Sequence, residues 1–117
     1  MLNHVKKFDL IEIIDGSTFI GIVDLGFDQS VRKKIKLINV KTHQPSVDAG
    51  AKVKAFVEDL LKNKSLFIKT FKDRYRKWST VLAVLYIYNE ETSAYINLND
   101  LLVEQSFGEK HVATTDY

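Results

Sequence analysis

Five segments of this chain are rich in β-branched and aromatic residues, and a single amphipathic stripe separates the third segment from the fourth. Residues of these types favour strands, and we expect strands at residues 10–14, 19–23, 35–40, 66–71 and 80–88. Both faces of the segment 35–40 are largely apolar, which predicts a central strand. The stripe has the spacing i, i+3, i+4, i+7 and i+8 of one helix face, formed by Val53, Phe56, Val57, Leu60 and Leu61.

Turn and capping signals set the ends of these elements. The sequence Asp15-Gly16-Ser17 predicts the turn between the first two strands, and residues 25–30 predict the next turn. Either Ser46 or Asp48 is expected to cap the first helix, because both side chains can accept a hydrogen bond from an N–H of the first turn. Asn63 is expected to end that helix.

A second helix is expected near the end of the chain, with Asn97 or Asn99 as its cap. Its apolar residues would be Leu98, Leu101, Leu102 and Phe107. The order β-β-β-α-β-β-α is that of an OB-fold barrel, so we predict a five-stranded barrel of the mainly β, α+β class. The length suits one domain over residues 1–117, with frayed ends at residues 1–7 and 112–117.

Composition argues against several classes of protein. The chain has no cysteine, so we expect neither disulfides nor thiolate chemistry. No apolar run approaches the roughly 20 residues that span a bilayer, and the first residues lack a signal-peptide pattern, so we expect a cytoplasmic protein without a membrane partner. The three histidines, His4, His43 and His111, are too far apart in the sequence to have the spacing of metal ligands. We therefore expect neither a metal nor a cofactor. The net charge of +2 does not by itself predict a nucleic-acid ligand.

Several short motifs occur in order along almost the whole chain. They include I-D-G-S-T at residues 14–18, N-V-K-T-H-Q at 39–44, K-A-F-V at 54–57, K-W-S-T-V-L-A at 77–83 and N-L-N-D-L-L-V-E-Q at 97–105. Over residues 8–111 this set resembles the staphylococcal-nuclease family, in versions found in phages and bacteria. The resemblance implies the same barrel fold.

The resemblance also implies a set of catalytic positions, most of which hold other residues in this chain. The family uses two Asp carboxylates for calcium, a Glu that acts on the attacking water, and two Arg that stabilise the transition state. The two Asp positions hold Ser17 and Lys41, and the Glu position holds Gln44. The two Arg positions hold Lys36 and Thr80. Thr42, whose counterpart offers a backbone carbonyl to the metal, is retained. We therefore expect a catalytically inactive module, in which Asp15 only caps its turn.

Two basic groups are the candidate contacts for single-stranded or duplex nucleic acid. Cations can meet phosphates while aromatic rings stack on bases. The candidates are Arg32, Lys33, Lys34, Lys36, Lys41, Lys72, Arg74, Tyr75, Arg76, Lys77 and Trp78. Two structural alternatives stay open: Trp78 can pack at the end of the barrel, and Lys41 can replace the charge of the missing metal.

Two other functions stay open. The fifth strand and the segment after it carry an aromatic group that would mark a protein-binding face if exposed, and would complete the core if buried. This group is Tyr86, Ile87, Tyr88, Tyr95 and Ile96. A protein-binding face would suit an adaptor or inhibitor encoded by a phage or a mobile element. The remaining alternative is a calcium-dependent nuclease with displaced catalytic residues. The pair Glu90-Glu91 has no nucleophile or metal ligand beside it in sequence, so we give it no catalytic role.

Overall fold

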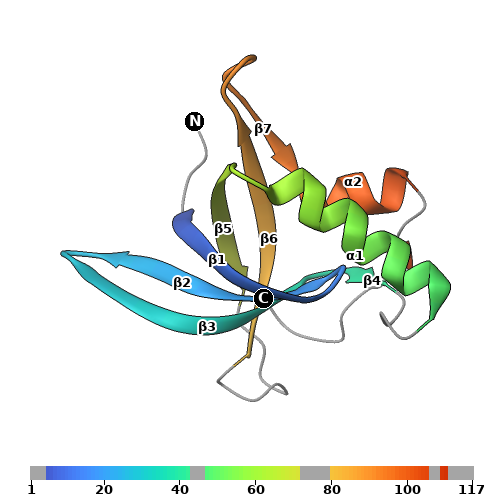
Figure 1. Ribbon diagram of the computed structural model, residues 1–117. Helices are drawn as coiled ribbons and strands as arrows, with labels where there is room; N and C mark the ends of the chain where they lie inside the picture. Colours follow the sequence, from blue (N-terminus) through green and yellow to red (C-terminus); the bar gives the residue numbers. More distant parts are fainter. Residues whose placement is uncertain (1–4, 43–46, 72–79, 106–108, 111–117) are drawn as a thin grey trace.

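A closed barrel of five strands is the central feature of the computed structural model, which describes residues 5–42, 47–71, 80–105 and 109–110 (Figure 1). The barrel strands are β1 (Lys6–Asp15), β2 (Thr18–Gly26), β3 (Gln29–Leu37), β5 (Ser65–Phe71) and β6 (Thr80–Asn89). They pair antiparallel in the order β3-β2-β1-β5-β6, and a parallel pairing of β3 with β6 closes the ring. The predicted OB-like barrel of the α+β class is therefore confirmed.

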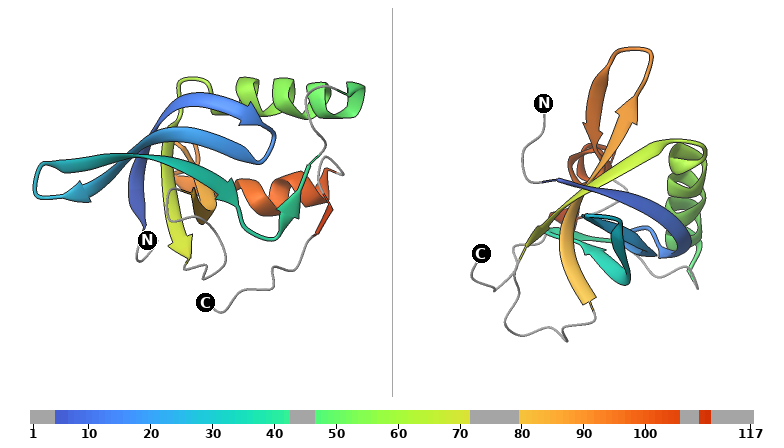
Figure 2. Two further views of the ribbon diagram at one scale, coloured as in Figure 1. Left: turned by 90° about the horizontal axis from the view of Figure 1, so that it is seen from below. Right: turned by 90° about the vertical axis from the view of Figure 1, so that its left-hand side faces the viewer.

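The other elements are added to this barrel. They are β4 (Val40–Lys41), α1 (Asp48–Leu61), β7 (Ala94–Asn97), α2 (Leu98–Glu104) and β8 (Glu109–Lys110). Strand β7 extends the sheet beyond β6, and β4 pairs with β8. Both helices lie at one end of the molecule, whereas the β2–β3 hairpin projects from the opposite end (Figure 2). Neither helix in the described part of the chain has the length and hydropathy that a membrane span requires.

Alternate residues of the strands point into one hydrophobic core. Its largest fully buried side chains include Phe8, Phe19, Ile35, Ile68 and Leu85. The predicted stripe of α1 closes the core at one end: Val53, Val57 and Leu61 are buried, and Phe56 and Leu60 pack against the cluster. Burial of a side chain of this size contributes about 1.5–3 kcal/mol, so the inward-facing positions dominate the stability of the barrel.

Two glycines allow the strands and the helix to approach this closely. A Cβ atom at Gly21 would overlap the ring of Phe8 across β1 and β2, and a Cβ atom at Gly16 would overlap the side chain of Val53 on α1. Gly16 lies in the predicted turn, which the structure confirms between the end of β1 and the start of β2. The turn therefore packs directly under the helix.

Several strand ends differ from the sequence-based expectation. Lys6 and Lys7 are not frayed, because they pair with Ile68 and Phe67 of β5. The other predicted frayed end, residues 112–117, lies outside the described part of the chain. Strand β3 begins at Gln29, well before residue 35. Its first half belongs to a hairpin whose residues 24–30 are exposed, and polar side chains there hide the alternation that a half-buried strand would show.

The strand predicted over residues 35–40 is two elements, because the backbone turns between them. Asn39 has a φ of 63°, which an extended strand does not allow, so β3 ends at Leu37 and the short β4 follows. The prediction that this strand is central is correct, because β3 pairs with β2 on one side and with β6 on the other.

The helix caps follow the predictions in part. Asp48 is not the cap of α1: it lies in the first turn after Val47, which makes no side-chain capping bond, and Ser46 lies outside the described residues. An acidic side chain in the first turn still interacts favourably with the helix dipole.

The other two capping predictions agree with the structure. Asn63 has a φ of 58°, as expected for the residue that ends the helix. Asn97 caps α2 through its side-chain oxygen, which accepts the N–H of Asp100 at 3.1 Å. Phe107 lies outside the described residues.

Asn99, the other candidate cap, has a different role. It lies where β3 and β6 pair to close the barrel, a junction that we call the seam. Its side chain is buried, and its Oδ1 accepts the N–H of Leu85 at 3.1 Å. Its Nδ2 donates to the carbonyls of Ile38 (2.9 Å) and Ala83 (3.2 Å). The amide therefore pairs with backbone groups of β6 and of the chain just beyond the end of β3. It continues the hydrogen bonding where β3 leaves the barrel.

We expect Asn99→Ala to destabilise the protein by about 2–4 kcal/mol, because each buried polar group left unpaired costs about 1–3 kcal/mol. The matched control is Asn97→Ala, which removes only an exposed helix cap and should cost about 1 kcal/mol. Urea unfolding followed by circular dichroism measures both. Equal losses in the two variants would contradict the role of Asn99 as the seam of the barrel.

Candidate functional site

The turn between β1 and β2 holds a buried chain of hydrogen bonds. Asp15 is 7% exposed and its Oδ1 accepts two bonds from Ser17, one from the backbone N–H at 2.8 Å and one from the hydroxyl at 3.2 Å. The Ser17 hydroxyl oxygen in turn accepts the hydroxyl of Thr42 at 3.0 Å. The Ser17 carbonyl accepts the N–H of Leu37 at 2.8 Å. These bonds tie the turn to the end of β3 and to the residue after β4.

The sequence-derived catalytic positions converge only in part. Ser17 and Thr42 are in direct contact, and Lys36 lies beside them because it precedes Leu37 and pairs with Thr18 on β2. Thr80 pairs with Lys34. Lys41 is exposed on β4, and Gln44 lies outside the described residues.

The chemistry available at this turn is that of one carboxylate and two hydroxyls. The hydroxyl of Thr42 donates to Ser17 and that of Ser17 donates to Asp15, so both protons are engaged within the turn. Across the part of the chain that the structure describes, no three His, Cys, Asp or Glu side chains gather in a way that could hold a metal ion. The capping role expected for Asp15 is confirmed.

The outer face of β3 carries a row of cations. Arg32 and Lys34 are exposed and Lys36 is half-buried, whereas Ile35 and Leu37 between and beyond them point into the core. Side chains on one face of a strand repeat about every 7 Å. Lys33 is half-buried on the inward-facing side of the strand, so it does not belong to this row.

Aromatic side chains cover the outer face of the neighbouring strands β5, β6 and β7. The rings of Phe67 and Tyr95 meet edge to face with centroids 5.6 Å apart, and those of Tyr88 and Tyr95 lie 5.2 Å apart. Tyr86 pairs with Phe67 across the strands and is half-buried. Tyr95 remains 37% exposed. The aromatic group predicted from sequence therefore lies partly at the surface.

The two isoleucines predicted in the same group belong instead to the core side of the sheet. Ile87 is 1% exposed within the core cluster, and Ile96 packs against that cluster. Strand alternation explains the division, because successive side chains point to opposite faces. The same alternation in β5 brings Phe67, Lys69 and Phe71 to the outer face. This set was not predicted, although the alternating apolar residues Leu66 and Ile68 mark the inner face in the sequence.

The cationic row and the aromatic side chains lie on the outward-facing side of adjoining barrel strands, and we call this side the outer face. Lys36 pairs with Leu82 of β6, and Leu82 pairs with Phe71 of β5. The ammonium of Lys69 lies 5.8 Å from the centroid of the Phe71 ring. The cations of β3 and the rings of β5 and β6 thus lie on adjoining strands, but Leu82 between them is buried at 2% exposure, so the two groups are separate at the surface.

The second basic group lies outside the described residues: Lys72, Arg74, Tyr75, Arg76, Lys77 and Trp78. The described residues that flank it are Phe71 and Thr80. They pair with Leu82 and Lys34, respectively.

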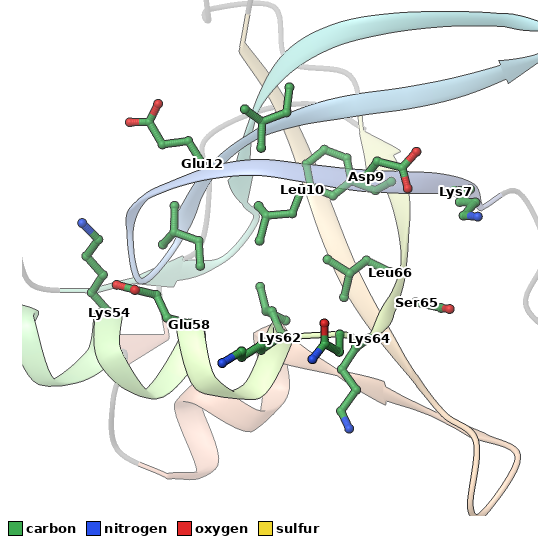
Figure 3. A pocket seen from close by; sticks show the side chains of 15 residues that line it. Lys7, Asp9, Leu10, Glu12, Lys54, Glu58, Lys62, Lys64, Ser65 and Leu66 are labelled. Atoms are coloured by element: carbon green, nitrogen blue, oxygen red, sulfur yellow. The ribbon is translucent and has the colours of Figure 1, made fainter.

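A separate groove of about 690 Å³ lies between β1 and the C-terminal part of α1 (Figure 3). The side chains of Leu10 and Leu66 point into it, and Lys54, Glu58 and Lys62 line its helix side. No local sequence pattern marks this groove, because it forms between elements that lie far apart in the chain.

We expect Asp15→Ala to lower stability by about 1–3 kcal/mol, because the buried N–H of Ser17 would lose its acceptor. Asp24→Ala is the matched control: Asp24 accepts the N–H of Gly26, also two residues ahead and also at 2.8 Å, but at an exposed position. Water replaces that acceptor, so a change of about 0.5 kcal/mol or less is expected. Chemical denaturation compares the variants, and equal effects would show that the buried chain of bonds does not stabilise the turn.

No protein-family model and no curated protein matches the chain, so the resemblance to staphylococcal nucleases rests on the motifs and stays a prediction.

Proposed function

We propose that this chain is a non-catalytic OB-type module that binds single-stranded nucleic acid on its outer face. The observation that supports the proposal most directly is that the cations of β3 and the aromatic side chains of β5, β6 and β7 lie on the outward-facing side of adjoining strands of one barrel. Proteins that bind single strands combine a positive track for the backbone with rings on which bases stack. Both parts occur here on one side of one sheet.

The electrostatic part of the proposal depends on Arg32, Lys34 and Lys36. A phosphate backbone that meets such cations releases condensed counterions, which gives affinity without sequence preference. Two acidic side chains of β1, Asp9 and Glu12, lie in register with Arg32 and Lys34, with strand β2 between them. They would repel phosphates on that side, so the ligand's path runs from β3 in the other direction, across β6.

The stacking part of the proposal depends on rings that already hold one another in place. Tyr95 contacts both Phe67 and Tyr88, and its own surface is still partly exposed. Contacts of this kind fix the rotamers before a ligand arrives, which lowers the entropy lost on binding. A base can then add to the existing stack. Single strands suit such a face better than duplexes, whose bases are stacked on each other.

The non-catalytic part of the proposal follows from the turn at Ser17. The resemblance implies a cation held there by carboxylates, but Ser17 is neutral and its hydroxyl is bonded to Asp15. Lys36 keeps a positive charge without the bidentate fork of an Arg. We infer that a scaffold related to the nucleases retains phosphate contacts and lacks the groups for hydrolysis.

We expect the double variant Arg32→Gln/Lys34→Gln to weaken binding of a fluorescent single-stranded oligonucleotide and to reduce its salt dependence. Each phosphate contact to a single strand contributes about 0.7 to the slope of log K against log salt, so the slope should fall by about 1.4. Fluorescence anisotropy over a range of salt concentrations measures both quantities.

The matched control for this variant is Lys52→Gln/Lys62→Gln, which removes the same charge from exposed positions around α1. It should leave the slope nearly unchanged. Equal loss in the two double variants, or no binding by the wild type at low salt, would contradict the proposed face. Gel analysis of the same oligonucleotides after incubation with calcium checks the non-catalytic part, because chelator-sensitive cleavage would overturn it.

We expect Tyr95→Ala to weaken binding by about 5- to 150-fold with little change in the salt slope, because stacking of one base contributes about 1–3 kcal/mol. Tyr95→Phe keeps the ring and should bind like the wild type. The same anisotropy titration distinguishes them. Equal affinities for the alanine and phenylalanine variants would remove Tyr95 from the binding face.

A further inference from the structure

Strand β2 carries apolar side chains on both of its faces. Phe19 and Val23 point into the barrel and are buried. Ile20 and Ile22 alternate with the residues of this inner row, are half-buried, and lie on the outward-facing side. Apolar residues on both faces are typical of a strand that is covered on both sides. In the described part of the chain, however, the main neighbours of β2 are the strands that pair with its two edges, β1 and β3.

A β-bulge in β1 adds a third isoleucine to the same side. The register with β2 shifts between Leu10 and Glu12, so Ile11, which is 49% exposed, is an extra residue. Leu10 and Ile13 both pack against the core, which leaves Ile11 and Glu12 together on the outward-facing side. Figure 3 shows Glu12 and Leu10 on opposite sides of β1. We call the resulting surface the isoleucine patch, which consists of Ile11, Ile20 and Ile22.

Charged side chains of opposite sign border the isoleucine patch on its two sides. Asp9 and Glu12 on β1 form an acidic pair, and Arg32 and Lys34 on β3 form a basic pair. Asp9 lies in register with Arg32 and Glu12 with Lys34, with the isoleucines of β2 between them. All four side chains are exposed. Since neighbouring strands lie about 4.8 Å apart, the two pairs are about 10 Å from each other across the patch.

A surface with this arrangement is complementary to itself. A second copy turned by 180° about an axis parallel to β2 places its β3 over β1 of the first copy. Asp9 of each copy then faces Arg32 of the other, and Glu12 faces Lys34. The isoleucines of β2 face their own counterparts, as in two sheets packed face to face about 10 Å apart. Charge and polarity therefore both select a second copy of this chain as the occupant of the patch.

We propose that the protein forms a twofold dimer through the isoleucine patch, with the acidic pair of each copy against the basic pair of the other. The same patch is used by both copies, so the assembly closes at two. The dimer does not rest on the proposed nucleic-acid binding. The two contacts exclude each other, because Arg32 and Lys34 belong to both, so a bound single strand would dissociate the dimer.

Reversing the charge of one pair at a time tests the dimer in the absence of nucleic acid. Arg32→Glu/Lys34→Glu leaves only acidic side chains beside the patch, and Asp9→Lys/Glu12→Lys leaves only basic ones. In sedimentation velocity, the wild-type protein is expected to dimerise as its concentration rises. Each double variant alone is expected to sediment as a monomer, because like charges would face each other across the contact.

Mixing the two double variants gives the decisive result. Each acidic pair then faces a basic pair of the other variant, so the mixture should form one-to-one dimers. Monomers in the mixture would overturn the proposal, as would wild-type protein that stays monomeric up to about 1 mM. Dimers of either double variant alone, or wild-type species larger than a dimer, would overturn it as well. Circular dichroism and urea midpoints close to those of the wild type establish that the variants are folded.

The apolar part of the contact is tested by Ile20→Thr/Ile22→Thr, which keeps β-branched residues in the strand and removes apolar surface. The dissociation constant of the dimer should rise by about tenfold or more. An unchanged constant would overturn the proposal, and lost oligonucleotide binding in the same variant would then assign the patch to nucleic acid.

A fourfold variant that carries both charge reversals separates the dimer from the proposed nucleic-acid binding. Its acidic and basic pairs have exchanged places, so it should dimerise like the wild type. It lacks the cations of β3, so it should bind the oligonucleotide weakly. A monomeric fourfold variant would contradict the dimer alone, whereas full oligonucleotide binding by this variant would contradict only the nucleic-acid face.

Discussion

The parallel pairing of β3 with β6 is the constraint on which the rest of this structure depends. It joins the first three strands to the last two, and without it the sheet would stay open. The pairing covers only Lys34 to Leu37 on β3, after which the chain turns away at Asn39. Asn99 then satisfies the backbone groups that β3 no longer meets. One side chain from α2 thus allows the barrel to close with a short seam, and leaves the far half of β6 free to pair with β7.

The same seam determines what the turn at Ser17 can do. The carbonyl of Ser17 is bonded to Leu37, the last residue of β3, and its hydroxyl is bonded to Asp15 and Thr42. One buried carboxylate is satisfied there by an N–H and a hydroxyl. A second carboxylate would repel the first unless a cation lay between them. Neutral Ser17 removes that requirement, so the turn is stable through hydrogen bonds alone.

The sequence carried enough information to predict the element order, because burial on one face imposes a period of 2 on strands and 3.6 on helices. It could not place the first half of β3, because most of its side chains are polar on both faces and the half-buried Val31 and Lys33 do not form a hydrophobic alternation. Asn97 and Asn99 are equivalent as capping residues in sequence, and only the packing of α2 against the seam separates them. The cationic row on β3 was found because its charges are adjacent in the chain. Its junction with Phe71 and the groove beside β1 both depend on pairings between distant segments, which local patterns do not encode.

The outer face and the hairpin tip expose aromatic residues in physically different ways, which implies different ligands. On the outer face, Tyr95 is held by Phe67 and Tyr88 and offers a flat surface to which a planar group can add. At the tip, Phe27 is 99% exposed and has no such neighbours. Strand β3 contributes to both, since its first residues build the hairpin and Arg32 to Lys36 form the cationic row.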